Sequence, residues 1–424
     1  MANREDGHGC QVPLAYPESV RIALPSLLLC SLSWAANFHA YVGQIESRAV
    51  LLAWGTTNGP NTIGRDSVSV GEAAIRIGGQ TLTTTRNWIQ VTGLEPDRSY
   101  PYSISVKGYT ATGTVRTYPE HSTHLRFFVI GDYGTGLAPQ REIAAAMQRE
   151  YARLAAAHDA PRFVITTGDN IYADLNFGLA TIHSGDNDAD WESKFFAPYG
   201  AIVSEIPFYP SPGNHDGNGS ENRGDLSAYL DNFFFPHNQP ARWYTFQFAD
   251  LAQFFSLDST TNTLSGRPKP AYLASGPEFS WFRQTIAASR APWKIPYFHH
   301  PPFNAGPFHG ASLNDLRAFV DTFAASGVKV VFSGHEHNFQ FSERNAATAG
   351  IQYVLSGAGG ELRPGDVRSK MAKAHIAGWA PEHHFLSVEI EGDEMRITLI
   401  GANGNLEPVD PAGRKITMPL VVRR

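Results

Sequence analysis

Two hydrophobic patterns divide the chain into regions of different structure. Between residues 40 and 118, the pattern has a period of two, as in residues 100–106, and includes short apolar runs such as residues 50–54. Turn-forming residues separate these runs, for example at residues 58–60 and 78–79. Because no helical periodicity interrupts the pattern, we predict an all-β sandwich of immunoglobulin-like size in this region.

The pattern changes after Pro119. The apolar runs at residues 127–130 and 163–165 are continuous rather than alternating, which is typical of strands buried on both faces of a sheet. Between these runs, apolar residues recur at helical spacing and predict an amphipathic helix whose stripe consists of Ile143, Met147, Tyr151 and Leu154. Strand, helix and strand in succession predict an α/β domain.

The same succession continues toward the C-terminus. Further strands are predicted at residues 206–209, 294–298 and 328–332, and further helices are predicted to begin at Pro277 and to cover residues 313–325. Two last apolar runs, residues 385–390 and 395–400, are separated by Gly392 and Asp393. These runs predict a β-hairpin that closes the domain.

The first residues of the chain have the pattern of an export signal. Residues 1–19 are polar, and residues 20–35 then combine a positive charge at Arg21, an apolar stretch and small residues that suit a cleavage site. Translation from Val20 would give this signal its usual arrangement. We therefore predict a secreted or periplasmic protein; the alternative is that residues 20–35 form a partly buried helix or strand.

Composition narrows the classes of function. The formal net charge is −6 and no block of like charges occurs, whereas a nucleic-acid-binding protein usually presents a basic face. No apolar run is long enough to suggest stable insertion in a membrane. The only cysteines, Cys10 and Cys30, lie near the N-terminus, so neither a disulfide framework nor a thiolate metal site is expected. Any metal must be held by oxygen and imidazole ligands, for which the 16 histidines are candidates.

Polar clusters follow five of the predicted strands. In chain order they are Gly131-Asp132-Tyr133-Gly134, Gly168-Asp169-Asn170-Ile171-Tyr172, Gly213-Asn214-His215-Asp216, His299-His300-Pro301-Pro302 and Gly334-His335-Glu336-His337. Ligands in open α/β folds bind where the loops after the strands converge on one crevice. One such cluster alone is usually a turn, but five at successive strand ends predict a metal site.

This ordered set of motifs resembles that of the calcineurin-like metallophosphoesterases, over residues 127–359. Two positions narrow the resemblance. Gly134 stands where most members have histidine, and Tyr172 stands where most have asparagine or aspartate. Both residues are similar to those of the purple acid phosphatases. The resemblance implies an α/β metallophosphoesterase domain with two central mixed sheets flanked by helices.

Three segments follow from these patterns. Residues 1–36 are the signal-like N-terminal segment, residues 37–119 are the β-sandwich, and residues 120–424 are the catalytic domain. The sandwich resembles a fibronectin type III domain, in which Leu94 would be a core residue and Tyr100 a corner residue.

The resemblance implies a centre of two metal ions. It assigns Fe³⁺ to Asp132, Tyr172 and His337, a divalent iron, zinc or manganese ion to Asn214, His299 and His335, and a bridging position to Asp169. The chemistry agrees, because hard Fe³⁺ prefers phenolate and carboxylate oxygen, whereas imidazole and amide groups suit the divalent ion. A tyrosinate bound to iron implies a coloured protein. His300 is the alternative to His299 as a ligand, and otherwise contacts a ligand or the substrate.

The implied reaction is hydrolysis of small phosphomonoesters at acid pH, with a metal-bound hydroxide attacking phosphorus in line. His215 is expected to stabilise the phosphoryl oxygens and His309 to protonate the leaving group, and both would contact substrate together with His300. One alternative is a phosphodiesterase of the same superfamily that uses two divalent ions. The other is a surface binding protein that acts through the β-sandwich.

The insertion after the second motif carries acidic residues. Asp186, Asp188 and Asp190 lack the distal glutamate of an EF-hand calcium loop, so we interpret them as the solvated start of a helix. The loops at residues 173–190 and 259–275 are expected to border the crevice and to influence specificity.

Overall fold

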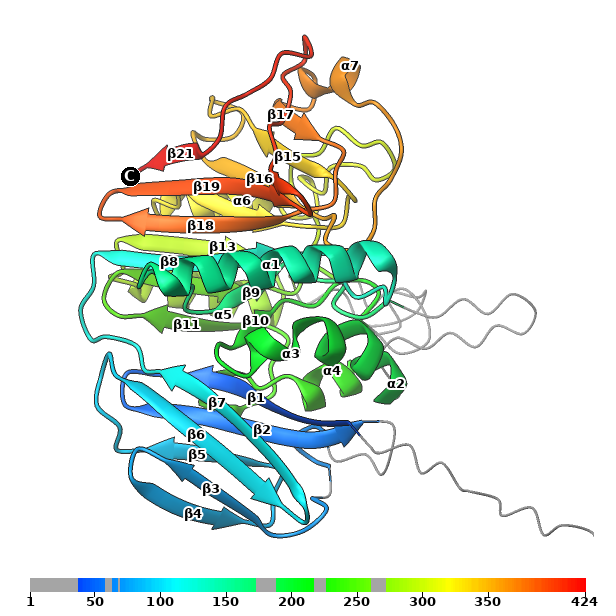
Figure 1. The fold of residues 1–424 in the computed structure, drawn as a ribbon. Helices are drawn as coiled ribbons and strands as arrows, with labels where there is room; N and C mark the ends of the chain where they lie inside the picture. The colour runs from blue at the N-terminus through cyan, green and yellow to red at the C-terminus, as the bar shows by residue number, and fades with distance from the viewer. Residues whose placement is uncertain (1–36, 58–62, 68, 173–187, 217–225, 261–271) are drawn as a thin grey trace, which may run out of the picture. The chain divides into compact units, whose positions relative to one another are not determined.

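The computed structural model describes residues 37–57, 63–67, 69–172, 188–216, 226–260 and 272–424 (Figure 1). Residues 1–36, which contain both cysteines and the predicted export signal, lie outside this description, as do Asp186 and residues 261–271 of the second predicted border loop. Among the described residues, no helix has the length and apolar character needed to cross a membrane.

Residues 37–116 form two antiparallel sheets, of strand order β1-β2-β5 and β4-β3-β6-β7. The strands are β1 (Asn37–Ile45), β2 (Ala49–Thr57), β3 (Ala73–Ile77), β4 (Gln80–Thr84), β5 (Trp88–Thr92), β6 (Ser99–Val106) and β7 (Tyr109–Arg116). In β6 buried and more exposed residues alternate along the strand, as a sheet with one face on a core requires. The period-two pattern therefore predicted the right structure.

The predicted core and corner residues of this sandwich are both buried. Leu94 and Tyr100 belong to its core, and the Tyr100 hydroxyl accepts a hydrogen bond from the backbone N–H of Glu95 at 2.8 Å. This bond ties the beginning of β6 to the preceding turn, which is the geometry of a tyrosine corner.

The rest of the described chain is an α/β domain with two mixed sheets of seven strands each. The first sheet has the order β10-β9-β8-β18-β19-β20, with β21 beside β19, and the second has the order β11-β12-β13-β14-β16-β15-β17. Their strands are β8 (His124–Ile130), β9 (Val164–Thr166), β10 (Phe208–Pro210), β11 (Tyr244–Phe248), β12 (Ala252–Ser256), β13 (Trp293–Tyr297), β14 (Val330–Ser333), β15 (Phe339–Ser342), β16 (Gln352–Ser356), β17 (Ile376–Ala380), β18 (Phe385–Glu391), β19 (Glu394–Gly401), β20 (Gly404–Asn405) and β21 (Leu420–Arg423).

Helical segments lie between these strands. They are α1 (Ala138–Ala156), α2 (Asp188–Trp191), the π-helical η1 (Glu192–Phe196), α3 (Ala197–Val203), α4 (Ser227–Asn232), the 3₁₀ segment η2 (Pro236–Asn238), α5 (Pro277–Ala288), α6 (Arg317–Ala325) and α7 (Arg368–Met371). The longest, α1, packs beside β19 and buries Ile143, Met147 and Leu154 of the predicted stripe (Figure 1).

One predicted helix begins later than expected. Residues 313–316 form a turn, and α6 starts only at Arg317, because Leu316 has a ψ of 12° that is not helical. The predicted C-terminal hairpin is confirmed, since β18 pairs with β19 around Gly392 and Asp393, and Gly392 has the positive φ of 53° that such a tight turn requires.

The two mixed sheets are joined by a core of aromatic rings. Phe127 on β8 lies 5.2 Å from Phe254 on β12 and 6.3 Å from Phe332 on β14, between ring centroids. Phe163 stacks on Phe127 at 5.4 Å. This packing aligns the carboxyl ends of β8, β9, β10, β13 and β14, and the five polar clusters follow those ends.

Candidate metal centre

Backbone hydrogen bonds join the five loops into one site. Asp132 N–H donates to the Gly168 carbonyl at 3.0 Å, and Gly334 N–H donates to the His299 carbonyl at 2.9 Å. The loops of the two sheets also meet directly, because the His335 N–H lies 3.0 Å from a carboxylate oxygen of Asp132. The structure therefore brings together all seven residues for which a metal-binding role was predicted.

Three of these residues have a left-handed backbone. The φ angles are 55° at Asp132, 50° at Asp169 and 73° at His335. Residues other than glycine seldom adopt such angles, and conformations of this kind concentrate at functional sites, where the surrounding structure holds them. At each position, the turn bends the chain just after a strand, and the residue contacts other members of the site.

Gly134 explains how Tyr172 reaches the site. A Cβ atom at position 134 would overlap the carbonyl oxygen of Asn170, so only glycine allows the first two loops to approach this closely. The approach is fixed by the Tyr172 N–H, which donates to the Gly134 carbonyl at 2.8 Å. Glycine at the first position and tyrosine at the second are therefore two parts of one local structure.

Tyr172 belongs to a buried group with two carboxylates and an imidazole. Its hydroxyl lies 3.0 Å from His337 Nε2 and 3.3 Å from Asp132 Oδ1. Asp132, Asp169 and His337 each offer a ligand atom within 4.8 Å of the other two. Two carboxylates, a phenol and an imidazole form the oxygen-rich donor set that a hard cation prefers.

The outer nitrogen of His337 has two neighbours. Its Nδ1 lies 3.0 Å from Glu361 Oε2 and 3.2 Å from Arg363 Nε. One nitrogen cannot donate to Glu361 and accept from Arg363 together. We assign the N–H to the shorter contact with Glu361, because this leaves a lone pair on Nε2 toward Asp132 and Tyr172. A carboxylate behind a histidine is the usual arrangement that orients a metal ligand.

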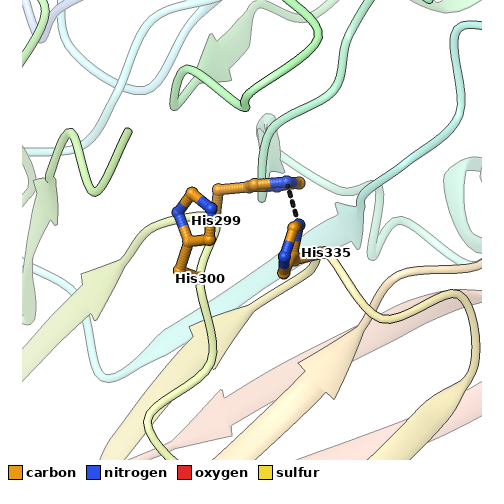
Figure 2. A group of neighbouring side chains, drawn as sticks. All are labelled: His299, His300 and His335. Atoms are coloured by element: carbon orange, nitrogen blue, oxygen red, sulfur yellow. Dashed lines mark hydrogen bonds between the residues drawn. The ribbon is translucent and has the colours of Figure 1, made fainter. Parts of the chain in front are cut away.

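The second group is centred on His299. Its Nδ1 donates to the Thr167 carbonyl at 2.9 Å, so Nε2 of the neutral ring carries a lone pair. Around Nε2 lie Asn214 Oδ1 at 2.8 Å, His335 Nδ1 at 3.1 Å and Asp169 Oδ2 at 3.4 Å. Figure 2 shows the contact between the rings of His299 and His335. An amide oxygen, a carboxylate oxygen and two imidazole nitrogens thus converge on one point, and this set of donor atoms fits a divalent metal ion.

His300 lies next to this second group, which is centred on His299. Its Nδ1 lies 3.0 Å from Ser259 Oγ, and its ring stands 4.3 Å from that of His335 (Figure 2). A ligand atom of His300 also lies within 4.8 Å of ligand atoms of His299 and His335. His299, which faces both Asn214 and Asp169, has the larger number of suitable partners.

The pKa values of two buried histidines show that the carboxylates around them favour a positive charge in the site. Burial lowers the pKa of His299, but the carboxylates of Asp169 and Asp132 outweigh it and raise this pKa to about 9. Burial likewise opposes protonation of His337, whose pKa is raised to about 9 by hydrogen bonds to Asp132 and Glu361. Protons held by these buried imidazoles occupy positions that a metal cation would take.

Burial and neighbouring charges also shift the pKa values of the other ionisable groups in the site. Burial raises the pKa of Asp132, and burial together with the two carboxylates raises the pKa of Tyr172 well above its ordinary value. Burial also opposes ionisation of Asp169, but His299 and His215 hold its pKa well below the usual range. Burial and neighbouring imidazoles lower the pKa of His335, and lower that of His300 to about 3.

The two predicted catalytic histidines lie beside different metal groups, His215 beside that of Tyr172 and His309 beside that of His299 and His335. The ring of His215 is 4.6 Å from that of Tyr172, and its backbone N–H donates to Asp169 Oδ1 at 2.8 Å. The ring of His309 is 3.9 Å from that of His335. Burial and then Arg363 lower the pKa of His309. Both histidines are half-buried at the edge of the metal groups.

The interpretation of Asp190 as a solvated residue is wrong. Asp190 is buried and forms an ion pair of 2.9 Å with Lys194, which is also buried. Lys194 Nζ donates in addition to the Tyr172 carbonyl at 2.8 Å. The helical segment α2 and η1 therefore supports the loop that carries Tyr172, a role for which the sequence pattern gave no signal.

Sequence reasoning also missed three residues around the two histidines of the last motif. Glu361 and Arg363 contact His337, and the buried Glu336 accepts hydrogen bonds from the N–H groups of Phe308 and His309 at 3.2 and 2.6 Å. Glu336 lies inside the fifth motif, and Glu361 follows the glycine stretch that ends the resemblance. Both positions could have indicated a neighbour of the site, but no spacing rule indicated their partners.

Comparisons with known proteins agree with this geometry. A model of the calcineurin-like phosphoesterase family matches residues 125–339, just over half of the chain. Tartrate-resistant acid phosphatase type 5 of Rattus norvegicus is 28% identical over 305 residues, which are 66% of this chain and 88% of that protein. Purple acid phosphatase 15 of Arabidopsis thaliana is 24% identical over 327 residues, 69% of this chain but only 56% of that protein.

The fold agrees with a solved structure as well. Purple acid phosphatase PPD1 from seeds of yellow lupin (Lupinus luteus) aligns with 91% of this chain and 74% of its own, with a TM-score of 0.65 and 13% sequence identity. At that identity the comparison supports the arrangement of sheets and the preceding β-strands. Together, the family match, the homologous sequences and the shared fold place this chain in the calcineurin-like phosphoesterase family, as a homologue of the purple acid phosphatases.

Proposed function

We propose that this protein hydrolyses phosphomonoesters at a centre of two metal ions, with an acid optimum. The family and the homologous acid phosphatases support phosphoester hydrolysis at a metal centre. One observation carries the finer proposal: the Tyr172 hydroxyl lies beside His337 and Asp132, in a place that Gly134 opens for it. This phenol distinguishes an iron-containing centre from a centre of two ordinary divalent ions.

The proposed ligands follow the two groups. Asp132, Tyr172 and His337 would hold Fe³⁺, whereas Asn214, His299 and His335 would hold a divalent iron, zinc or manganese ion. Asp169 belongs to both groups, since it lies with Asp132 and His337 and also faces His299 Nε2 at 3.4 Å. When bound, two such ions polarise phosphoryl oxygens and activate water as a nucleophile.

The remaining residues would act on the substrate. His215, above the ring of Tyr172, is placed to donate to phosphoryl oxygens that gain charge in the transition state. His309 would donate a proton to the leaving oxygen, and His300 would contact the phosphate from the side of His335. Glu336 fixes the loop of His309, because a backbone N–H bonded to a buried carboxylate restricts the position of the ring.

Two matched tyrosine variants test the proposal. The wild-type chain, purified aerobically, is expected to contain about two metal ions, at least one of them iron, and to be coloured by charge transfer from tyrosinate. Tyr172→Phe should abolish the colour. Tyr133→Phe is the control, because Tyr133 is equally buried but its hydroxyl donates to Asn170 Oδ1 at 3.0 Å. That variant should keep the colour.

The possible outcomes separate the candidate functions. A coloured wild type whose colour is lost only in Tyr172→Phe, and which releases phosphate from monoesters faster than from diesters, supports the proposal. A colourless wild type with two zinc or manganese ions would instead favour a divalent-metal phosphodiesterase. A protein that takes up no metal under any reconstitution would contradict both and return attention to binding by the β-sandwich.

We also propose that the protein is exported, on the basis of the signal-like segment at residues 20–35. Amino-terminal sequencing of protein recovered from the periplasm or the medium tests this. A mature N-terminus after Ala35 is expected, and exported protein that still contains Cys30 would contradict the proposal.

A further inference from the structure

An exposed aromatic ring lies directly beside the metal groups. Among the described residues, the large apolar side chains that are most exposed are Leu137, Phe308 and Leu362, and Phe308 has the highest exposure, at 64%. A single exposed leucine is ordinary on a protein surface. Phe308 differs because the structure holds its ring in a defined place.

One contact of its backbone and one contact of its ring fix that place. The backbone N–H of Phe308 donates to the buried Glu336 carboxylate at 3.2 Å, and the guanidinium carbon of Arg363 lies 4.8 Å from the centre of the ring. A cation over one face of an aromatic ring is attracted by the electron density of that face. Gly365 lies against Pro307, so the two loops that carry Phe308 and Arg363 pack together.

The same contacts connect the ring to both metal groups. The ring of His309, the next residue along the chain, contacts that of His335, with centroids 3.9 Å apart and the ring planes tilted by 32°. Arg363, on the other side, approaches His337 Nδ1 at 3.2 Å and donates its backbone N–H to the His337 carbonyl at 3.1 Å. Phe308 therefore stands above the His335-Glu336-His337 segment, next to the histidine proposed to face the leaving group.

We propose that Phe308 is a specificity-determining residue that stacks on an aromatic leaving group, so that the preferred substrates are phosphomonoesters of flat aromatic alcohols. This inference rests on the proposed function. Arg363 acts as a positioning residue, since it covers one face of the ring and leaves the other for the substrate. Offset stacking of two rings stabilises a complex beyond the burial of apolar area, and it favours flat substrates over alkyl chains of similar polarity.

The test compares two substrates in three variants of the full-length, metal-loaded chain. For each variant, kcat/KM is divided by the wild-type value with the same ester, which cancels the intrinsic reactivity of the leaving group. Phe308→Ala should lower kcat/KM for 2-naphthyl phosphate about threefold to tenfold, mainly through KM, and leave ethyl phosphate within about twofold. Phe308→Tyr keeps the ring and should retain the wild-type preference.

Leu137→Ala is the matched control, because it removes another exposed apolar side chain from the described surface. It should change both esters equally and little. Calorimetric binding of a non-hydrolysable 2-naphthyl phosphonate provides the same comparison without turnover, and Phe308→Ala should weaken it by the same factor.

Four results would overturn the inference. Equal losses for both esters in Phe308→Ala would show that the ring supports the loop rather than the substrate. A selective loss in Leu137→Ala would show that any apolar surface produces the effect. Phosphate release from neither ester by the wild type would refute the proposed function, and this inference with it, whereas turnover of both esters without selectivity would refute the inference alone.

Discussion

Removing the charge of Lys194 should destabilise the loop that carries Tyr172. Lys194 and Asp190 form an ion pair of 2.9 Å, and their side chains are only 3% and 2% exposed. The same ammonium group donates to the Tyr172 carbonyl at 2.8 Å. In Lys194→Met, the apolar stem remains similar in size, but the carboxylate of Asp190 loses the cation beside it.

The expected cost follows from this burial. Breaking a buried ion pair by removing one partner costs about 3–5 kcal/mol, because the remaining charge stays in a medium that solvates it poorly. An exposed pair of the same length contributes about 0–1 kcal/mol. Arg48 and Glu120 form such a pair, also at 2.9 Å, with side chains 61% and 50% exposed. The difference between the two pairs therefore isolates the effect of burial.

The assay is chemical denaturation of the metal-free protein, which keeps metal binding out of the measured free energy of unfolding. Lys194→Met should lower that free energy by about 3 kcal/mol or more, and Arg48→Met by less than about 1 kcal/mol. The double variant Lys194→Met/Asp190→Asn also removes the charge of Asp190 and should recover about 2 kcal/mol of the loss.

Two results would refute this reasoning. If Lys194→Met and Arg48→Met cost the same, then burial does not set the strength of the pair. If the double variant is no more stable than Lys194→Met, then the loss comes from packing or from the hydrogen bond to Tyr172 rather than from the loss of the cation beside Asp190.

Three further predictions concern other parts of the molecule. His124 bonds Asp159 at 2.7 Å and Glu391 at 2.8 Å; burial opposes protonation, but these bonds outweigh it and raise the His124 pKa. A raised pKa stabilises the fold fully below the unfolded value near 6.5 and less as pH rises through the folded value. His124→Gln should therefore lower the free energy of unfolding by about 0.5 kcal/mol at pH 5 and by less at pH 9 in denaturant titrations, and a larger loss at pH 9 would contradict this. Gly134→Ala should reduce iron content and lower the free energy of unfolding by about 1–3 kcal/mol, because its methyl group meets the Asn170 carbonyl; an iron content equal to wild type would show that the loops can separate without cost. His309→Ala should lower kcat for an alkyl phosphate by about a hundredfold and for an aryl ester with an acidic leaving group by much less, and full turnover of the alkyl ester would exclude a role as proton donor.

One further group of potential metal ligands lies outside the site, and it shows that residue types alone do not identify a metal centre. His124, Asp159 and Glu389 each offer a ligand atom within 4.8 Å of the others. Arg126 lies between the two carboxylates, at 2.6 Å from Asp159 and 3.0 Å from Glu389. Arg126 already pairs with both carboxylates, so these residues form an ion-pair network around His124 and Arg126 of β8.

The local pattern of the sequence determined a large part of this fold. Alternation and short apolar runs indicated a β-structure in residues 37–116, and continuous apolar runs identified β8, β9, β13 and β14, because burial of one or both faces of a strand determines which of its residues are apolar. The stripe of α1 and the turn at Gly392 were predicted for the same reason. The strands β11, β12, β15, β16 and β17 of the second sheet were not predicted.

The order of the motifs likewise indicated which residues belong to the site, and the structure brings all seven proposed ligands together. The sequence patterns could not predict which loops, far apart along the chain, approach one another. The contacts of Arg363 with Phe308 and His337, and of Lys194 with Tyr172, depend on how two sheets and a helical segment pack. No periodicity encodes such distances, because they result from close packing of the whole core. The tertiary structure alone decided which charged residues contact the proposed ligands and which exposed aromatic ring lies beside them.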